Sequence, residues 1–500
     1  MEENLRSKTF WGIIWSYVNR FGTQLIAIVP TMILARLISP SEYGLLAMTA
    51  VFTGVASMLA DGGFGNALVQ KKDADHLDFC SVFYLNLVIC SIIYILFWFL
   101  APFFASFFYE VRLIWIIRIT SLNIILGAIG QIHGIIFKKN IEYKKPAIRN
   151  IFVQLVSAAL ALCMAFGGYG VWALVVQGLS QTLLGSIANW VISTWRPSLC
   201  FSLYRLRLLF NFGSMLLLRS LIDYVFDKLY DVIIGRYYSA SSLAYYNRGV
   251  SSVSLFSGSF WGIFSGILFP VFVKMQDDND KLRSSVSKFV KTTTLVYFSV
   301  ILTILVLADP LFKMMYSSKW DAAIPYFQLL CIPALNLPLL QILESVLWAK
   351  GESGKMLTVV ILYKILFVVA LWMTWEYGII YMIWGQVVCE IFELLLFSYY
   401  TSNVVGYGII DLIVDIWKNV CISILLTVIV LICDNIFSFL FVWIGSEFVV
   451  SSLRFGLGVI VSIIAFIGIN KIIGLDGYKD VVSIFSYNIG CKRFAKFLSP

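Results

Sequence analysis

The sequence predicts an all-α polytopic membrane protein, with fourteen transmembrane helices in two pseudo-symmetric six-helix lobes plus two C-terminal helices. The first observation is composition: the 500 residues are 60% hydrophobic and 13% charged, about half the charged fraction of a soluble domain. The second is a series of apolar runs of about 20 residues, the length that a helix needs to cross the hydrocarbon core. The third is a set of motifs that recur after a shift of 200 residues.

Fourteen apolar runs predict the fourteen helices, and short connections separate them. No connection is long enough to fold as a soluble domain, so we expect one membrane-embedded unit. The first run is too long for a signal peptide and lacks a small-residue cleavage site, so no signal peptide is expected. The expected spans are 11–35, 43–68, 79–101, 112–137, 146–166, 170–194, 209–235, 243–270, 284–308, 322–348, 355–374, 377–400, 410–433 and 448–470.

Lysine and arginine are concentrated in alternate connections, and this bias predicts the orientation. With the N-terminus in the cytoplasm, the inner segments hold 22 of these residues and the outer segments hold 5. We therefore expect both termini in the cytoplasm and an even number of helices. The net charge of +9 follows from this topology, and no basic patch on a soluble domain indicates a nucleic-acid partner.

Matching segments indicate an internal duplication. Arg36 and Ser39, after the first run, correspond to Arg236 and Ser239, after the seventh. The starts of runs six and twelve are also alike, as are the ends of runs four and ten. Parallel repeats of this kind predict a two-lobed transporter with its substrate site between the lobes. The predicted division is a first lobe at 1–207, a second lobe at 208–402, two further helices at 403–470 and a cytoplasmic tail at 471–500.

Four charged residues on the seventh predicted helix are spaced four apart, so they form one gently winding stripe that turns about 40° per step. Charges facing lipid are costly, so the stripe is expected to face protein or water. The positions 200 residues earlier, on the first helix, form a milder polar stripe, and both helices are predicted to line a shared cavity. The alternative is a structural ion-pair ladder, for example Arg219 with Asp223 and Asp227 with Lys228. The two stripes are Arg219, Asp223, Asp227 and Asp231, and Asn19, Thr23, Ala27 and Thr31.

Other charged residues fall inside the predicted spans. Arg20, Arg118 and Arg248 are candidates for binding a phosphate, because the planar guanidinium group suits bidentate contacts. Arg118 has an internal salt bridge as an equal alternative. Asp61 and Glu344 can titrate in an ion-coupled cycle, with helix-packing hydrogen bonds as the alternative.

Further polar positions have simpler explanations. Arg149 lies close to a span end, where snorkelling to the membrane surface explains it, and Gln154 and Glu390 are also candidates for burial. The glycines Gly62 and Gly63 loosen the second helix or allow close helix packing.

Cysteine and histidine give no catalytic or metal signature. The nine cysteines are scattered without a CxxC pair, and the only histidines are His76 and His133. Neither histidine has an obvious partner in the sequence. We therefore expect no metal site, no catalytic residue and no cofactor other than a possible coupling proton or sodium ion.

Several segments resemble the Wzx-type polysaccharide flippases of the MOP superfamily (multidrug, oligosaccharidyl-lipid and polysaccharide exporters), within it the group of colanic-acid and teichuronic-acid exporters. The resemblance covers essentially the whole chain. Individual motifs are moderately specific, and their order and spacing strengthen the match. The segments are Ala35–Gly44, Asp61–Gln70 and Leu243–Arg248, the last with the pattern Tyr-Tyr-x-Arg.

The resemblance implies a flippase that moves undecaprenyl-diphosphate-linked oligosaccharide repeat units across the bacterial cytoplasmic membrane by alternating access, for surface polysaccharide synthesis. It implies membrane lipids and polysaccharide polymerase machinery as partners. Carried onto this chain, Arg20 and Arg248 match best as diphosphate or sugar contacts, and Arg219 fits by position. The aspartates of the seventh helix are more acidic than an anion site suggests, so they are assigned to ion coupling or sugar recognition.

Two other functions stay open at this point. A MATE-like cation-coupled antiporter for small molecules would suit the aspartates of the seventh helix but not the three arginines in the spans. A membrane polysaccharide polymerase or ligase would be expected to carry a large outer loop with catalytic Arg or His, and the outer connections here are short.

Overall fold

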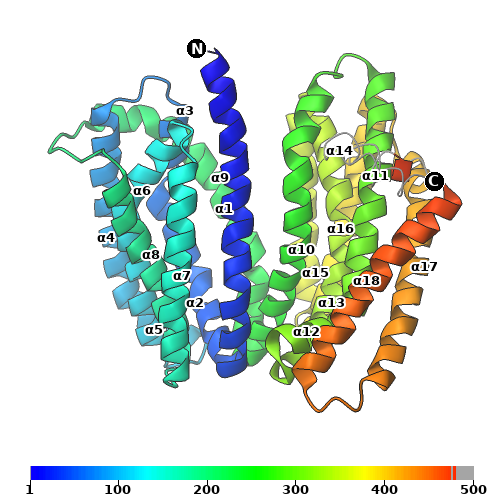
Figure 1. The fold of residues 1–500 in the computed structure, drawn as a ribbon. Coiled ribbons are helices and arrows are strands. Elements are labelled where there is room, and N and C mark those ends of the chain that lie inside the picture. Colours follow the sequence, from blue (N-terminus) through cyan, green and yellow to red (C-terminus); the bar gives the residue numbers. More distant parts are fainter. Residues whose placement is uncertain (1, 475–476, 480–500) are drawn as a thin grey trace. The chain divides into compact units, whose positions relative to one another are not determined.

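The chain folds into helices throughout its described part (Figure 1). The structure is a computed structural model that describes the backbone of residues 2–474 and 477–479. Within this part the chain forms eighteen α-helices and one 3-10 helix and no strand. The side chains that lie outside the description are those of residues 2–10, 13, 61, 211–212, 215–216 and 259–267.

Twelve segments in the described part are long and apolar enough to cross a membrane, which confirms an all-α, multi-pass membrane protein. Each of the fourteen expected spans coincides with a helix or with two consecutive helices. The seventh and eighth spans correspond to α9 (Leu203–Tyr237) and α10 (Ala240–Val273). These two helices are not among the twelve, and both include residues whose side chains are outside the description.

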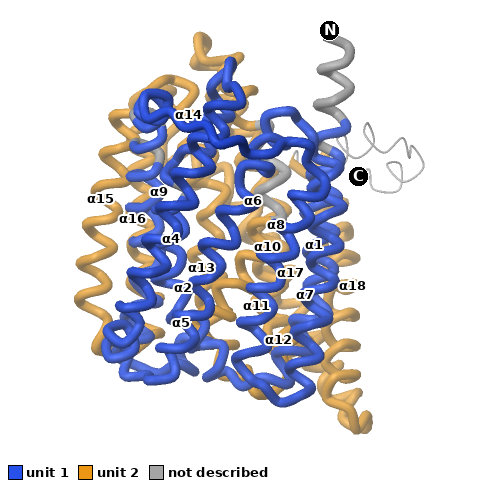
Figure 2. Tube along the Cα trace, turned by 90° about the vertical axis from the view of Figure 1, so that its left-hand side faces the viewer, with its two compact units in different colours: residues 1–244 blue, residues 245–500 orange. Residues whose placement is uncertain are grey.

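The first compact unit comprises Met1–Ala244 (Figure 2). Its helices pack as neighbours in the pairs α1 with α7, α7 with α8, α8 with α6 and α6 with α4, and α9 packs against α2, α3 and α4. Besides α9 and the start of α10, the helices are α1 (Glu2–Leu37), α2 (Pro40–Asp61), α3 (Phe64–Gln70), α4 (His76–Phe107), α5 (Leu113–Thr120), α6 (Leu122–Lys139), α7 (Lys144–Phe166) and α8 (Val171–Ile192).

Two adjacent glycines separate α2 from α3. Gly62 and Gly63 adopt φ values of 56° and 72°, in the left-handed region that favours glycine. A Cβ atom on Gly63 would overlap the backbone carbonyl of Gly213 in α9. The glycine run therefore serves close packing between α3 and α9, which is one of the two explanations that the sequence offered.

A buried carboxylate fixes one end of unit 1. The Asp78 side chain is fully buried and forms ion pairs with Lys71, at 2.5 Å, and with Arg205 of α9, at 3.5 Å. Asp75 caps the N-terminus of α4 by accepting a hydrogen bond from the Asp78 backbone N–H. This network, together with buried apolar side chains of α3, α4, α6 and α9, ties α9 to the rest of the unit.

The second compact unit comprises Tyr245–Pro500. Its closest helix pairs are α11 with α17, α15 with α16 and α12 with α18. Arg454 of α18 joins three helices, because it pairs with Asp434 of α17 at 2.7 Å and with Asp309 of α12 at 3.1 Å. Besides most of α10, the elements are α11 (Asn279–Val306), α12 (Ala308–Tyr316), η1 (Ser318–Ala323), α13 (Ile324–Ala334), α14 (Leu337–Ala349), α15 (Ser353–Thr374), α16 (Ile379–Val405), α17 (Ile409–Leu440) and α18 (Glu447–Ile473).

Local details recur along the chain at shifts of about 200 to 214 residues. Helix α1 ends at Leu37 before α2, and α9 ends at Tyr237 before α10, which is the same position after a shift of 200 residues. The fourth and tenth spans are both interrupted, between α5 and α6 and between α13 and α14. Lys139 and Lys350, at equivalent helix ends, both donate to backbone carbonyls of the connection that follows the second or eighth span.

Candidate functional site

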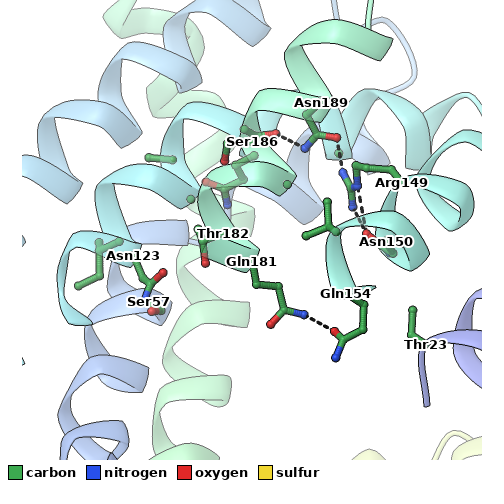
Figure 3. Close-up of a pocket in the computed structure, with 18 of the residues that line it drawn as sticks. Thr23, Ser57, Asn123, Arg149, Asn150, Gln154, Gln181, Thr182, Ser186 and Asn189 are labelled. Atoms are coloured by element: carbon green, nitrogen blue, oxygen red, sulfur yellow. Dashed lines mark hydrogen bonds between the residues drawn. The ribbon is translucent and has the colours of Figure 1, made fainter. Parts of the chain in front are cut away.

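A cavity of about 880 Å³ lies among the helices of unit 1 (Figure 3). Side chains of α1, α2, α4, α6, α7 and α8 line it, and most of the lining side chains longer than alanine are polar. Because the surrounding segments are apolar enough to span a membrane, such a polar lining is a functional-site signal. The polar side chains that line it are Asn19, Arg20, Thr23, Gln24, Ser57, Asn123, Gln131, Arg149, Asn150, Gln154, Gln181, Thr182, Ser186 and Asn189.

Small residues on α6 and α8 create the space. Gly127, Gly130 and Gly134 follow one another at spacings of three and four on α6, so they lie on one face of that helix. At Gly130 the helices approach so closely that an added Cβ would lie 2.6 Å from the Ser186 hydroxyl. Ser186 also donates a hydrogen bond of 2.6 Å to the Leu126 carbonyl, so α6 and α8 are held together beside the cavity.

A polar relay joins four helices at the edge of the cavity. Arg149 of α7 donates to the side-chain oxygen of Asn189 on α8 and, from Nε at 3.0 Å, to that of Asn150 (Figure 3). Asn150 in turn donates to the side-chain oxygen of Asn19 on α1 at 3.1 Å. Asn189 completes the relay by donating to the Gly130 carbonyl at 2.9 Å. These amides orient the guanidinium group. They are neutral, so they do not balance its positive charge.

Amide and hydroxyl groups fill the rest of the lining. Gln181 of α8 donates to Gln154 of α7 at 2.7 Å (Figure 3). The side-chain oxygen of Asn123 is buried and has no hydrogen-bond partner in the described part of the chain. A buried acceptor without a partner is unfavourable, so Asn123 is suited to accept a hydrogen bond from a bound hydroxyl.

Two arginines line the cavity. They are Arg20 and Arg149, and none of the described lining residues is an aspartate or a glutamate. Arginine forms bidentate hydrogen bonds with phosphate and carboxylate groups, and the amides supply both donors and acceptors for hydroxyls. The arrangement can therefore bind a polar, hydroxyl-rich molecule that carries an anionic group.

The structure places four of the residues that were predicted to line a cavity in this one, namely Asn19, Arg20, Thr23 and Ala27. Arg118 lies elsewhere in unit 1. Its guanidinium group stands over the rings of Trp98 and Trp115, at 4.7 and 5.2 Å from the ring centroids, and its Nε donates to the Trp98 carbonyl. These contacts hold Arg118 against aromatic rings, and no ion pair of Arg118 is found among the described side chains.

The charged stripe of α9 lies outside the residues that line the cavity. Arg219 and Asp223 approach each other to 3.9 Å, and both side chains are about half exposed or more. Asp227 is exposed. Asp231 is nearly buried and pairs with Lys228 at 2.7 Å. Ion pairs are thus present on α9, and those described join Arg219 to Asp223 and Lys228 to Asp231.

Arg248 and Glu344 belong to unit 2. The Arg248 guanidinium group lies 4.7 Å from the ring centroids of both Tyr316 and Trp320. Glu344 of α14 accepts a hydrogen bond of 3.3 Å from the indole of Trp348. The remaining predicted residue, Asp61, ends α2, and its side chain lies outside the described residues.

Several lining residues were not singled out from the sequence. Asn150, Gln181 and Asn189 belong to predicted spans five and six, and Arg149 had snorkelling as its simpler explanation. The signal that points to them is periodic: Gln181, Gly185 and Asn189 are spaced four apart on one face of α8. Amides are less conspicuous than charges, so this face did not stand out.

Comparison with known proteins gives the family. The family model described as "Polysaccharide biosynthesis protein" matches residues 33–325, more than half of the chain. The chain belongs to this family.

Curated relatives and a solved structure agree with this assignment. The chain is 26% identical to the lipopolysaccharide biosynthesis protein WzxC of Escherichia coli over 70% of this chain and 71% of the relative. It is 25% identical to the teichuronic acid biosynthesis protein TuaB of Bacillus subtilis over 68% and 71%. The fold resembles that of the lipid II flippase MurJ in its inward closed conformation, with a TM-score of 0.69, 15% identity and coverage of 94% of this chain and 100% of that chain.

The protein is therefore a member of the polysaccharide biosynthesis protein family, with a fold like that of MurJ. It is a multi-pass membrane protein.

Proposed function

We propose that this protein is a flippase that moves undecaprenyl-diphosphate-linked oligosaccharide repeat units across the bacterial cytoplasmic membrane by alternating access. The observation that carries the proposal is the polar, cationic cavity of unit 1, which lies among membrane-spanning helices. In this proposal the amides and hydroxyls bind the sugar, and Arg149 and Arg20 bind an anionic group of the diphosphate or the glycan. Arg219, Arg248 and Arg118 stay proposed substrate contacts outside this cavity.

The proposed topology has fourteen transmembrane helices, both termini in the cytoplasm, and lobes at 1–207 and 208–402, followed by helices at 403–470 and a tail at 471–500. The excess of lysine and arginine in alternate connections supports the orientation. The recurring helix ends and interrupted helices support the repeat. By this repeat α9 begins the second lobe, although it packs against α2, α3 and α4 in the present structure. Membrane lipids and the polysaccharide polymerase machinery are the proposed partners.

The proposal keeps a role for the acidic residues. Asp223, Asp227 and Asp231 of α9, with Asp61 and Glu344, are proposed to line the transport route or to bind a coupling proton or sodium ion. A MATE-like antiporter for small cations is the competing function. The cavity disfavours this function, because arginine repels a cation and the described lining residues include two arginines and no aspartate or glutamate.

Replacing Arg149 tests the proposal in cells. Arg149→Gln removes the charge and leaves a polar side chain beside Asn150 and Asn189. A charged hydrogen bond contributes about 1.5–3 kcal/mol, so we expect surface polysaccharide to fall by roughly tenfold or more, with normal amounts of protein in the membrane. Arg112→Gln is the matched control, because Arg112 is exposed outside the cavity beside Glu110, and it should leave the polymer unchanged. Unchanged polymer in Arg149→Gln would contradict the assigned role.

A further inference from the structure

Three potential metal ligands meet at one end of unit 1, outside the polar cavity. His76 and Cys80 are spaced four apart in the first turns of α4, so their side chains lie on one helix face. Cys200 comes from the connection between α8 and α9, 120 residues further along the chain. One ligand atom from each residue lies within 4.8 Å of the other two.

The distances fit a small thiophilic cation. The Cys80 sulfur lies 3.3 Å from Nε2 of His76. Zinc bonds of about 2.0–2.3 Å in a tetrahedron separate neighbouring ligand atoms by roughly 3.5 Å. The ligand atoms therefore need only small movements to surround one zinc ion.

A serine hydroxyl occupies the space among these atoms. The Ser198 Oγ atom lies 2.9 Å from His76 Nε2, 3.1 Å from the Cys200 sulfur and 3.7 Å from the Cys80 sulfur. A hydroxyl in contact with all three ligand atoms marks a common centre. Ser198 can turn aside for the ion or provide a fourth oxygen ligand.

The connection is held against α4 by further contacts. The backbone N–H of Ser198 points at the Cys80 sulfur at 3.4 Å, and that of Ser202 donates to the Ser81 hydroxyl at 3.0 Å. Trp195 packs edge-on against Phe79 and Phe83. The ligands on both segments are therefore positioned before any ion binds, which lowers the entropy cost of binding.

We propose that His76, Cys80 and Cys200 bind one thiophilic divalent cation of the zinc class, with Ser198 or water in the fourth position. Two thiols and one imidazole are the donors that zinc prefers. The ion would replace the two thiol protons, so that one Zn²⁺ binds, two protons are released and the site is neutral. Its structural effect is to cross-link α4 to the connection that leads into α9.

The hydrogen bonds of His76 impose one condition on binding. The Trp195 indole N–H donates to His76 Nδ1 at 3.1 Å, so the neutral ring carries its proton on Nε2 in the metal-free state. Zinc needs the lone pair of Nε2, so on binding the ring proton moves to Nδ1 and the bond from Trp195 is lost. The proposal therefore predicts that Trp195 opposes zinc binding.

Zinc content of the full-length, reduced protein in detergent tests the site. After dialysis against Zn²⁺ and removal of excess, we expect one equivalent of zinc in the wild type and its loss in Cys200→Ala and in His76→Gln. His76 is exposed, so its replacement should not disturb folding. Cys163→Ala and Cys421→Ala are matched controls at exposed cysteines and should retain the ion. No zinc in the wild type, or equal zinc in His76→Gln, would overturn the proposal.

A competition titration of Trp195→Phe with a zinc chelator gives an independent readout. Phenylalanine keeps an aromatic ring but lacks the N–H donor that competes for His76. We expect zinc affinity to rise roughly twofold to tenfold, because this factor corresponds to the net free energy of one neutral hydrogen bond. A lower affinity in this variant would contradict the assigned ligand atom, since the indole would then be supporting the bound state.

Discussion

At the residue scale, the cavity shows what a single sequence reveals about a membrane site. Arg20 was predicted from its charge within a span, and Asn19 was predicted from the 200-residue repeat. Arg149 was assigned to snorkelling because its distance from the end of a span does not show which side chains surround it. The structure supplies Asn150 and Asn189 as its partners, from the same helix and from α8. Long-range partners of this kind are set by helix packing and not by spacing along the chain.

Asn123 offers a prediction that separates binding from stability. Its buried side-chain oxygen has no hydrogen-bond partner in the described structure. Asn123→Leu therefore replaces an unfavourable buried polar group with an apolar side chain of similar size. We expect unchanged or higher thermal stability, with a drop in surface polysaccharide. Asn419→Leu is the comparison, since it removes hydrogen bonds of 2.8 Å to the Lys291 carbonyl and the Thr294 hydroxyl and should lower stability. If Asn123→Leu supports full polymer production, Asn123 does not contact substrate.

At the element scale, helix positions were predictable but helix interruptions were not. Each apolar run coincides with helical structure, because hydrophobicity over about 20 residues requires a span. Hydrophobicity does not predict the helix breaks at Ser121 and Asn336, since one polar residue within an apolar run is compatible with a continuous helix. Helix α12 was also missed, because nine residues that include Asp309 and Lys313 form no apolar run.

The packing of α3 against α9 gives a prediction about glycine. Gly63→Ala places a Cβ where φ is 72° and where the Gly213 carbonyl already lies. The left-handed conformation costs about 1–2 kcal/mol, and the overlap adds roughly 1–3 kcal/mol. Gly168→Ala is the matched control, because φ is 78° there but nothing lies within 4 Å of the added atom. Thermal unfolding in detergent should show the larger loss for Gly63→Ala, and equal losses would refute close packing.

The start of α11 has a pH dependence with a defined sign. Asp278 caps the N-terminus of α11, and hydrogen bonds from Lys281 lower its pKa. The side chain of Lys281 has the larger effect, and its backbone N–H has the smaller one. A lowered pKa contributes stability above the unfolded value of about 4, and this contribution is lost as pH falls. Hydrogen exchange of the backbone amides of residues 279–285 measures this contribution. At pH 7 these amides should be better protected in the wild type than in Asp278→Asn, and the two protection levels should converge as the pH falls below about 4. A difference that persists in acid would argue against the carboxylate as its source.

At the scale of the whole molecule, the multi-pass helical fold followed from composition, and the family followed from motifs in a fixed order. The charge bias also predicts a topology, which reporter fusions can measure. Fusions truncated after Asp73 should place the reporter in the cytoplasm, and those after Gly168 should place it outside. Active alkaline phosphatase after Asp73, or fluorescent protein folded in the cytoplasm after Gly168, would reverse the orientation.

The most direct test of the account is lipid flipping by the purified protein in proteoliposomes. The substrate is an undecaprenyl-diphosphate oligosaccharide, and the readout is its exposure to an enzyme that cannot cross the membrane. We predict that wild type and Arg112→Gln expose the inner-leaflet substrate, while Arg149→Gln does so at a rate reduced roughly tenfold or more. Equal rates for wild type and Arg149→Gln, or no flipping by wild type, would contradict the assignment of the unit 1 cavity to a lipid-linked glycan.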